Sequence, residues 1–146
     1  MATVVQAKFY GKFFLSLATK QIHLDNDVIK AMLCPASYTP DQDAHQFRSD
    51  VTAEITGTGY NAGGLVVDIN LAYDSSNNRL VIDGPDIAWD EATFAARSLV
   101  LYDSTPATDA TRPLIGYLLF DQDVQVTNSS FEVAWDGSGI AYVTAA

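Results

Sequence analysis

Alternating apolar and polar residues, in short runs separated by turn residues, dominate the chain and predict a mainly β protein. The clearest run covers residues 65–73, where every second residue from Leu65 to Leu71 is Leu, Val or Ile. Because successive side chains of a strand point to opposite faces, this period predicts one buried and one exposed face. The polar segment 74–78 connects this run to an apolar run at 80–82, which predicts an antiparallel hairpin with a loop of about five residues.

Further strands are predicted wherever a short apolar or alternating run lies between turn signals. They cover residues 28–34, 51–55, 87–89, 95–102, 114–120, 131–135 and 140–144. A turn sequence, Asp-Gly-Ser-Gly, joins the last two and predicts a closing hairpin, and Gly116 is a candidate for a β-bulge. Residues 105–113 and 121–130 are predicted as connectors from their composition.

The N-terminal twenty residues follow a different pattern. Residues 1–11 have no clear period and end at Gly11, so they are predicted as an arm or an edge strand rather than part of the core. Aromatic and leucine side chains at positions 10, 13, 14 and 17 recur with helical spacing and predict a short helix over residues 12–20. Apolar residues at positions 13, 15 and 17 also alternate as in a strand, and we favour the helix.

Eight or nine short strands with regularly spaced turns and one helix predict an antiparallel β-sandwich or barrel. We favour a jelly-roll-like β-sandwich with one short N-terminal helix. The chain shows no internal repeat, low-complexity linker or change in composition along its length. Residues 12–146 are therefore predicted to form a single domain, preceded by the arm or edge strand at 1–11.

Composition and charge limit the partners of this domain. The 146 residues are 48% hydrophobic and 18% charged, which is typical of a globular domain that buries its own core. Eighteen acidic and eight basic residues give a formal net charge of -10, which repels nucleic-acid phosphates and anionic membrane surfaces. No apolar run approaches the roughly 20 residues of a membrane span. We therefore expect no direct nucleic-acid partner and no membrane partner.

The single cysteine indicates that the protein does not depend on an oxidising compartment. Cys34 has no second cysteine to pair with, which excludes an intramolecular disulfide and cysteine-based zinc sites. It lies in a predicted buried strand, where small apolar residues belong. The N-terminal segment lacks an uninterrupted apolar region followed by a clear cleavage site, so no signal peptide is predicted.

Two loops resemble ligand-binding motifs only in part. The glycine-rich segment 57–64 is not a nucleotide-binding loop, because Leu65 stands where a P-loop requires lysine and a predicted strand follows. Acidic residues and His45 within residues 41–50 could turn several ligand atoms toward a cation. The segment lacks the glycine and glutamate of an EF-hand, so we favour a solvated acidic loop and predict no metal site and no cofactor.

No catalytic residue is predicted. His23 and His45 are the only histidines, and neither lies in a motif with a serine or cysteine nucleophile. A pair of glycosidase carboxylates is defined by a separation in space, which the sequence does not supply. The protein is therefore predicted not to be an enzyme, and a hydrolase with paired carboxylates ranks last among the alternatives.

The aromatic residues divide into core and surface candidates. Tyr117 and Trp135 lie inside apolar runs, which favours burial. Tyr38 and Tyr60 flank the polar loop and are predicted to be presented to a partner. The candidate partner-contact residues are Phe9, Tyr10, Tyr38, Phe47 and Tyr60.

Five segments stand out in order along the chain: FLSLATKQIHLDNDVIKAMLCPASYTPDQDAHQFRSDV, EITGTGYNAGG, WDEATFAARSLVLYD, RPLIGYLLFD and FEVAWDGSGI. Together they resemble a family of small virion proteins of tailed bacteriophages. The resemblance covers nearly the whole chain after Phe14 and gives no catalytic residues to carry over.

The resemblance implies a role as a capsid cement or decoration protein. In such proteins β-sandwich subunits, often trimeric, lie on the outer capsid over junctions between major capsid proteins and resist the pressure of the packaged DNA. We therefore expect the phage major capsid protein and further copies of this chain, as a homotrimer, to be its partners. The expected location is the capsid exterior of the virion, after synthesis in the host cytoplasm, and residues 1–11 are a candidate capsid-contacting arm. The alternative is a neck, tail or fibre module that binds a protein or host carbohydrate through Tyr38, Tyr60 and the loop between them.

Overall fold

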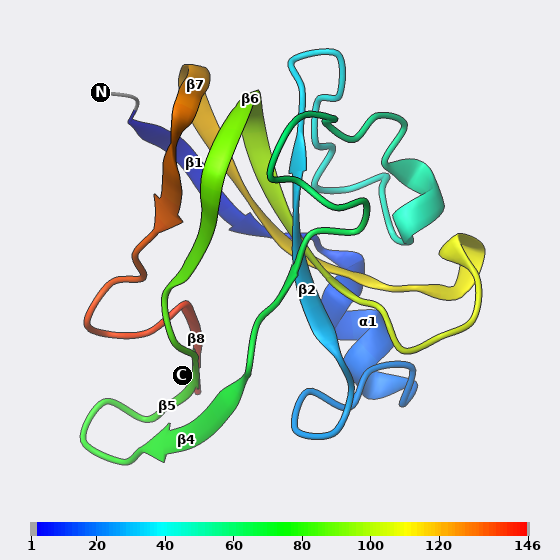
Figure 1. Ribbon diagram of the computed structural model, residues 1–146. Coiled ribbons are helices and arrows are strands. Elements are labelled where there is room, and N and C mark those ends of the chain that lie inside the picture. The colour runs from blue at the N-terminus through cyan, green and yellow to red at the C-terminus, as the bar shows by residue number, and fades with distance from the viewer. Residues whose placement is uncertain (1–2, 146) are drawn as a thin grey trace.

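The computed structural model describes residues 3–145 and contains two antiparallel β-sheets and one short α-helix near the N-terminus (Figure 1). Its elements are β1 (Val4–Phe9), α1 (Lys12–Ala18), β2 (Ile29–Cys34), η1 (Arg48–Asp50), β3 (Leu65–Val66), β4 (Asn70–Asp74), β5 (Arg79–Asp83), β6 (Ile87–Asp103), η2 (Asp109–Thr111), β7 (Leu114–Val133) and β8 (Ala141–Thr144), where η marks a 3-10 helix. The five-stranded sheet has the order β1-β7-β6-β2-β3, and the three-stranded sheet has the order β4-β5-β8. The predicted mainly β fold with one N-terminal helix is confirmed, whereas a jelly roll is not shown by this strand order. Among the described residues, no helix is long and apolar enough to cross a membrane.

A long hairpin of β6 and β7 forms the centre of the five-stranded sheet. β6 has 17 residues and β7 has 20, and they pair antiparallel along most of their length. Glu91, with φ of 50°, and Asn128, with φ of 48°, lie where the pairing register shifts. Such bulges bend and twist a strand locally, so the two strands can curve across the rest of the protein.

The strand boundaries predicted for this hairpin are wrong. Residues 87–89 and 95–102 belong to the single strand β6, and the predicted connector 121–130 lies inside β7. Most of residues 121–130 are exposed, so their hydrophobic alternation is weak although backbone pairing with β6 continues. The bulge predicted near Gly116 is confirmed, because the register shifts by one residue directly beside it.

Each face of the five-stranded sheet is covered by its own hydrophobic cluster. One cluster contains Phe13 of α1 and Ile82 of β5, so the helix and the three-stranded sheet lie over that face. The other contains Tyr38 and Val51, so the segment between β2 and β3 covers the opposite face. Cys34 is buried in this second cluster, as predicted, and burial raises the pKa of its thiol to about 12.

The predicted strand 65–73 is two strands in two different sheets. β3 pairs with β2 and β4 pairs with β5, so the chain crosses between the sheets at residues 67–69. Val67 is buried at the crossing, and its N–H donates to Ile29 O at 2.9 Å. The alternation continues through the crossing, which is why it predicted one strand. The β4–β5 hairpin predicted across residues 74–78 is confirmed.

Two other predicted elements are wrong. Residues 51–55 form no regular strand, although Ile55 N–H donates to Leu33 O at 3.0 Å. β8 pairs with β5 rather than with the end of β7, so the predicted closing hairpin does not form. Asp136 and Gly139 still bridge across the predicted turn. The local turn was therefore predicted correctly, and the strand that follows it joins the other sheet.

The N-terminal segment is an edge strand followed by the predicted helix. β1 pairs only with β7 and ends the five-stranded sheet. Helix α1, predicted over residues 12–20, buries Phe13 and Ser16. Phe9 stacks on Phe13 with ring centroids 5.2 Å apart, which fixes the helix against β1. Residues 1 and 2 of the predicted arm, and residue 146, lie outside the described residues.

Gly64 provides a test of the close approach between β2 and the start of β3. Its φ is +82°, and a Cβ placed on it would overlap the backbone O of Ala31. We expect Gly64→Ala to lower the free energy of unfolding by about 3 kcal/mol or more in urea titrations. Gly137→Ala is the control, because nothing lies within 4 Å of its Cβ position, and it should change stability by less than about 0.5 kcal/mol. Equal losses in the two variants would contradict this packing.

Candidate functional site

An open apolar groove lies between the five-stranded sheet and the end of the three-stranded sheet. Its volume is about 960 Å³, and its walls come from β1, β6, β7, β8 and the turn before β8. The apolar residues that line it include Ala7, Phe9, Leu118, Phe120, Val126 and Ala141. Several of them also pack against the first hydrophobic cluster, so the groove is an open end of that core.

Two unpaired strand edges border this groove. β1 is the last strand of the large sheet and β8 the last strand of the small sheet, so each pairs with one neighbour. Figure 1 shows the small sheet projecting at the lower left, close to the C-terminus. Val4 and Val5 of β1 are 44% and 54% exposed, which extends the apolar surface beyond the groove. Unpaired, apolar strand edges are sites at which another strand can add.

The groove carries little charge, and the protein around it is acidic. Among the described residues that line it, Lys8, Glu132 and Asp136 are charged. The hydroxyl and N–H of Ser138 donate to Asp136 Oδ1 at 2.6 and 2.9 Å and hold the pKa of that carboxyl below its usual range. All four arginines of the chain pair with carboxylates. The surface is therefore left with an excess of negative charge.

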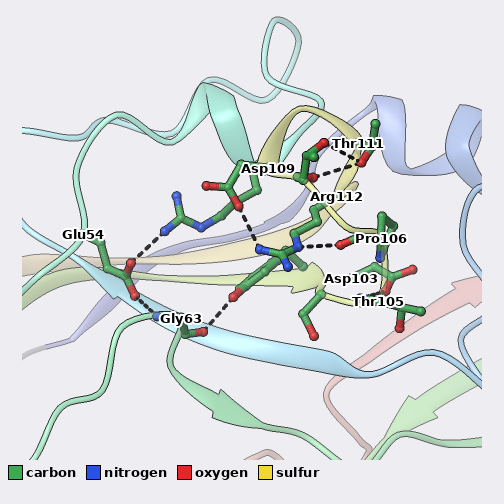
Figure 2. A network of polar contacts seen from close by, with 12 residues as sticks. Glu54, Gly63, Asp103, Thr105, Pro106, Asp109, Thr111 and Arg112 are labelled. Atoms are coloured by element: carbon green, nitrogen blue, oxygen red, sulfur yellow. Dashed lines mark hydrogen bonds and ion pairs between the residues drawn. The ribbon is translucent and has the colours of Figure 1, made fainter.

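A second feature is a buried polar network around Glu54 (Figure 2). Glu54 accepts hydrogen bonds from Arg48 Nη2 at 2.7 Å, from the Tyr60 hydroxyl at 2.6 Å and from Gly63 N–H at 2.6 Å. The Tyr102 hydroxyl donates to Gly63 O at 2.8 Å. The side chains of Arg48 and Glu54 are 14% and 15% exposed, so their ion pair is largely removed from water. Removal of one partner would leave the other charge buried and unpaired.

This network fastens the segment 37–64 to β2 and β6. The Tyr60 hydroxyl also accepts a hydrogen bond from Leu33 N–H at 3.0 Å. The Arg48 guanidinium lies over the Tyr102 ring, 5.8 Å from its centroid. Burial, and then the hydrogen bond to the network carboxylate, raise the pKa of Tyr60, so its phenol stays neutral at physiological pH. Tyr60 is therefore a structural residue of the loop.

Asp103 is a fully buried acid at the end of β6 (Figure 2). Thr105 N–H donates to Asp103 Oδ1 at 2.9 Å, whereas Oδ2 has no donor. Burial, and then the neighbouring Asp27 carboxyl, raise the pKa of Asp103 to about 6. Burial also acts to raise the pKa of Asp27, but the interaction with Asp103 and the N–H of His23 lower it overall. Asp103 is therefore the more readily protonated acid of the two.

Two of the five predicted contact residues are core residues. Tyr10 and Tyr38 are 0% and 2% exposed, and their hydroxyl oxygens lie 2.9 Å apart. The Tyr38 hydroxyl also lies 2.9 Å from His45 Nδ1. Polar partners inside the protein therefore allow both tyrosines to be buried beside a polar loop, and neither offers a surface to a partner.

The other three predicted contact residues are partly buried and lie in different places. Phe9 lines the groove, Phe47 bridges to Pro113, and Tyr60 belongs to the Glu54 network. The structure therefore brings only Phe9 to the groove. The apolar residues of β7 that line the groove were not predicted as a surface. Only Val124 and Val126 of this wall fall in the predicted connector 121–130, and the rest of its apolar residues lie in the predicted strands 114–120 and 131–135.

The acidic loop at 41–50 uses its oxygens within the loop. The N–H groups of Ala44 and Asp43 each donate to Asp41 Oδ1 at 3.0 Å and lower the pKa of Asp41. Asp50 accepts the N–H groups of residues 46 and 47 at 2.8 and 2.9 Å. Within residues 3–145, no group of three or more His, Cys, Asp or Glu side chains is placed to hold a metal ion.

No family model, no curated protein and no solved structure matches the chain. The resemblance described from the five sequence segments therefore stays a prediction. The groove, the unpaired strand edges and the surface charge are the structural features from which a function can be inferred.

Glu54→Ala tests whether the buried network holds the loop in place. The variant leaves the Arg48 guanidinium buried without its partner, so we expect the free energy of unfolding to fall by about 3–5 kcal/mol. Asp109→Ala removes the partner of Arg112 in an ion pair whose acid is 50% exposed, and it should cost less than about 1 kcal/mol. Urea unfolding of both variants measures the difference, and similar losses would argue against the network.

Asp103→Asn tests the raised pKa of this buried acid. Because the pKa of Asp103 is higher in the folded than in the unfolded protein, protonation of Asp103 favours folding. This contribution to the free energy of unfolding is complete below about pH 4 and is lost as the pH rises through about 6. Asparagine keeps an acceptor for Thr105 N–H and supplies a permanent donor. We expect the variant to gain roughly 1–3 kcal/mol relative to the wild type between pH 4.5 and pH 7, from urea unfolding across that range. A difference in stability that does not change with pH would reject the raised pKa of Asp103.

Proposed function

We propose that the chain is a non-enzymatic structural protein of a tailed-bacteriophage virion, where it acts as a capsid cement or decoration protein. It binds the outer surface of the major capsid shell and stabilises it, as a homotrimer of jelly-roll-like β-sandwich subunits. The observation that carries the proposal is the open apolar groove bordered by the unpaired edges of β1 and β8, because such a surface suits contact with another protein. The resemblance of the quoted segments supplies the virion context.

The position of β1 refines the proposed capsid contact. Residues 4–9 are paired with β7, and Thr3 N–H donates to Asp121 Oδ1 at 2.9 Å. Contact through this segment is therefore proposed to use the free edge of β1 and the exposed Val4 and Val5, rather than a detached arm. The net charge of -10 keeps unassembled copies soluble before they reach the shell.

The alternative is a neck, tail or fibre module that uses the same groove for a protein partner. Binding of host carbohydrate through Tyr38 and Tyr60 is less favoured, because Tyr38 is buried and the Tyr60 hydroxyl is held by Glu54 and Leu33. Stacking on a sugar needs an open aromatic face, whereas the Tyr38 ring already stacks with His45 and the Tyr60 ring packs against Trp89 and Phe94.

Copy number in the virion separates these roles. Quantitative mass spectrometry of purified parent virions should give an amount of this chain comparable to that of the major capsid protein. The control is a tail protein measured in the same digest, which fixes the scale for components present in few copies. A tail-like copy number would favour the alternative, and absence from purified particles would reject both virion roles.

A further inference from the structure

The backbone of β1 indicates what occupies the groove. Hydrogen-bonded and non-hydrogen-bonded pairs alternate along an antiparallel ladder. Tyr10 N–H donates to Ile115 O at 3.1 Å, and the register with β7 runs without a shift from Phe9 to Gln6. The N–H and C=O groups of Phe9 and Ala7 therefore point away from β7. No strand among residues 3–145 pairs with this side of β1.

The residues with free backbone groups are also groove residues. Ala7 and Phe9 both line the groove, and Tyr142 of β8 lines it from the other sheet. A strand added to β1 places every second side chain on the groove side, where the walls are mainly apolar. A small apolar molecule would fill the volume but leave the backbone groups of β1 unpaired. An extended peptide satisfies both the backbone edge and the apolar walls.

The charge of the protein indicates the charge of this peptide. The chain carries a net charge of -10, and two of the three charged groove residues, Glu132 and Asp136, are acidic. A second copy of the chain would bring the same negative charge to the groove, which disfavours it as the occupant, so the proposed homotrimer would use another surface. A segment that carries lysine or arginine is attracted instead by the net charge of the whole protein, which outweighs the single positive charge of Lys8 on β1.

We propose that the groove binds an extended segment of a different polypeptide, which adds as a strand to the free edge of β1. The segment has apolar side chains at alternate positions, directed into the groove, and basic side chains between them. Strand addition of this kind gives affinity through main-chain hydrogen bonds and specificity through the alternate side chains. The assignment of the segment to the capsid shell protein rests on the proposed function, whereas strand addition itself rests on the groove.

The test uses the full chain and three synthetic seven-residue peptides. The first alternates lysine and valine, the second replaces lysine with glutamate, and the third places proline at the central valine of the first. Binding is followed by fluorescence anisotropy, and the site by backbone amide shifts in NMR. We expect the lysine peptide to bind and to shift the amides of Ala7 and Phe9. The other two peptides should bind at least about tenfold more weakly, since one is repelled and one cannot complete the ladder.

A pair of variants at one position isolates the edge. Ala7→Pro removes the outward N–H while leaving the pairing of β1 with β7, because the Ala7 N–H does not face β7. Ala7→Ser keeps the N–H at nearly the same volume. We expect Ala7→Pro to weaken binding of the lysine peptide by about tenfold, with Ala7→Ser close to the wild type. Unfolding curves of both variants report whether the fold is retained.

Several results would overturn the proposal. They are equal binding of the glutamate peptide, unchanged affinity in a folded Ala7→Pro variant, amide shifts confined to residues outside the groove, and self-association that competes with the peptide. The virion copy number is an independent measurement. Peptide binding together with a tail-like copy number would support strand addition and reject the capsid role. A capsid-like copy number without peptide binding would reject strand addition alone.

Discussion

Backbone pairing between β6 and β7 is the interaction on which the rest of the structure depends. These strands pair with each other and carry β1 on one side and β2 on the other. The helix, the small sheet and the segment between β2 and β3 then pack on the two faces that this hairpin creates. The bulges within the hairpin matter as much as its length, because a flat ribbon of this size could not curve over both clusters.

Local signals in the sequence predicted local structure well. The β4–β5 hairpin, helix α1 and the burial of Cys34 follow from turn residues, helical spacing and an apolar run, each of which acts over a few neighbouring residues. The pattern did not reveal that the chain changes sheets at Val67, or that β8 joins β5. A period of two specifies which face of a strand is buried and not which strand it pairs with. Long exposed stretches such as 121–130 lack even that signal.

The candidate site was harder to predict than the fold. Tyr38 was expected at the surface because it follows a turn and precedes polar residues, yet hydroxyl partners inside the protein allow it to be buried. The groove is assembled from β1, β7 and β8, which are remote in sequence, so no single segment carries its pattern. Phe9 was the one predicted contact residue that lies there. The charge, by contrast, was available from composition alone and helps to define the proposed occupant.

The position of β1 at the edge of the large sheet leaves its segment without a partner strand for part of the time in which the protein is synthesised. Thr3 and Asp121, which meet at the end of the β1–β7 ladder, are 118 residues apart. During translation the segment that becomes β1 is synthesised before β7 and has no partner strand until β7 follows. At typical rates of synthesis this delay is roughly 6–24 s. During this delay the apolar residues of the β1 segment are free to contact other chains, so chaperone binding to this segment would protect the protein before its large sheet can close.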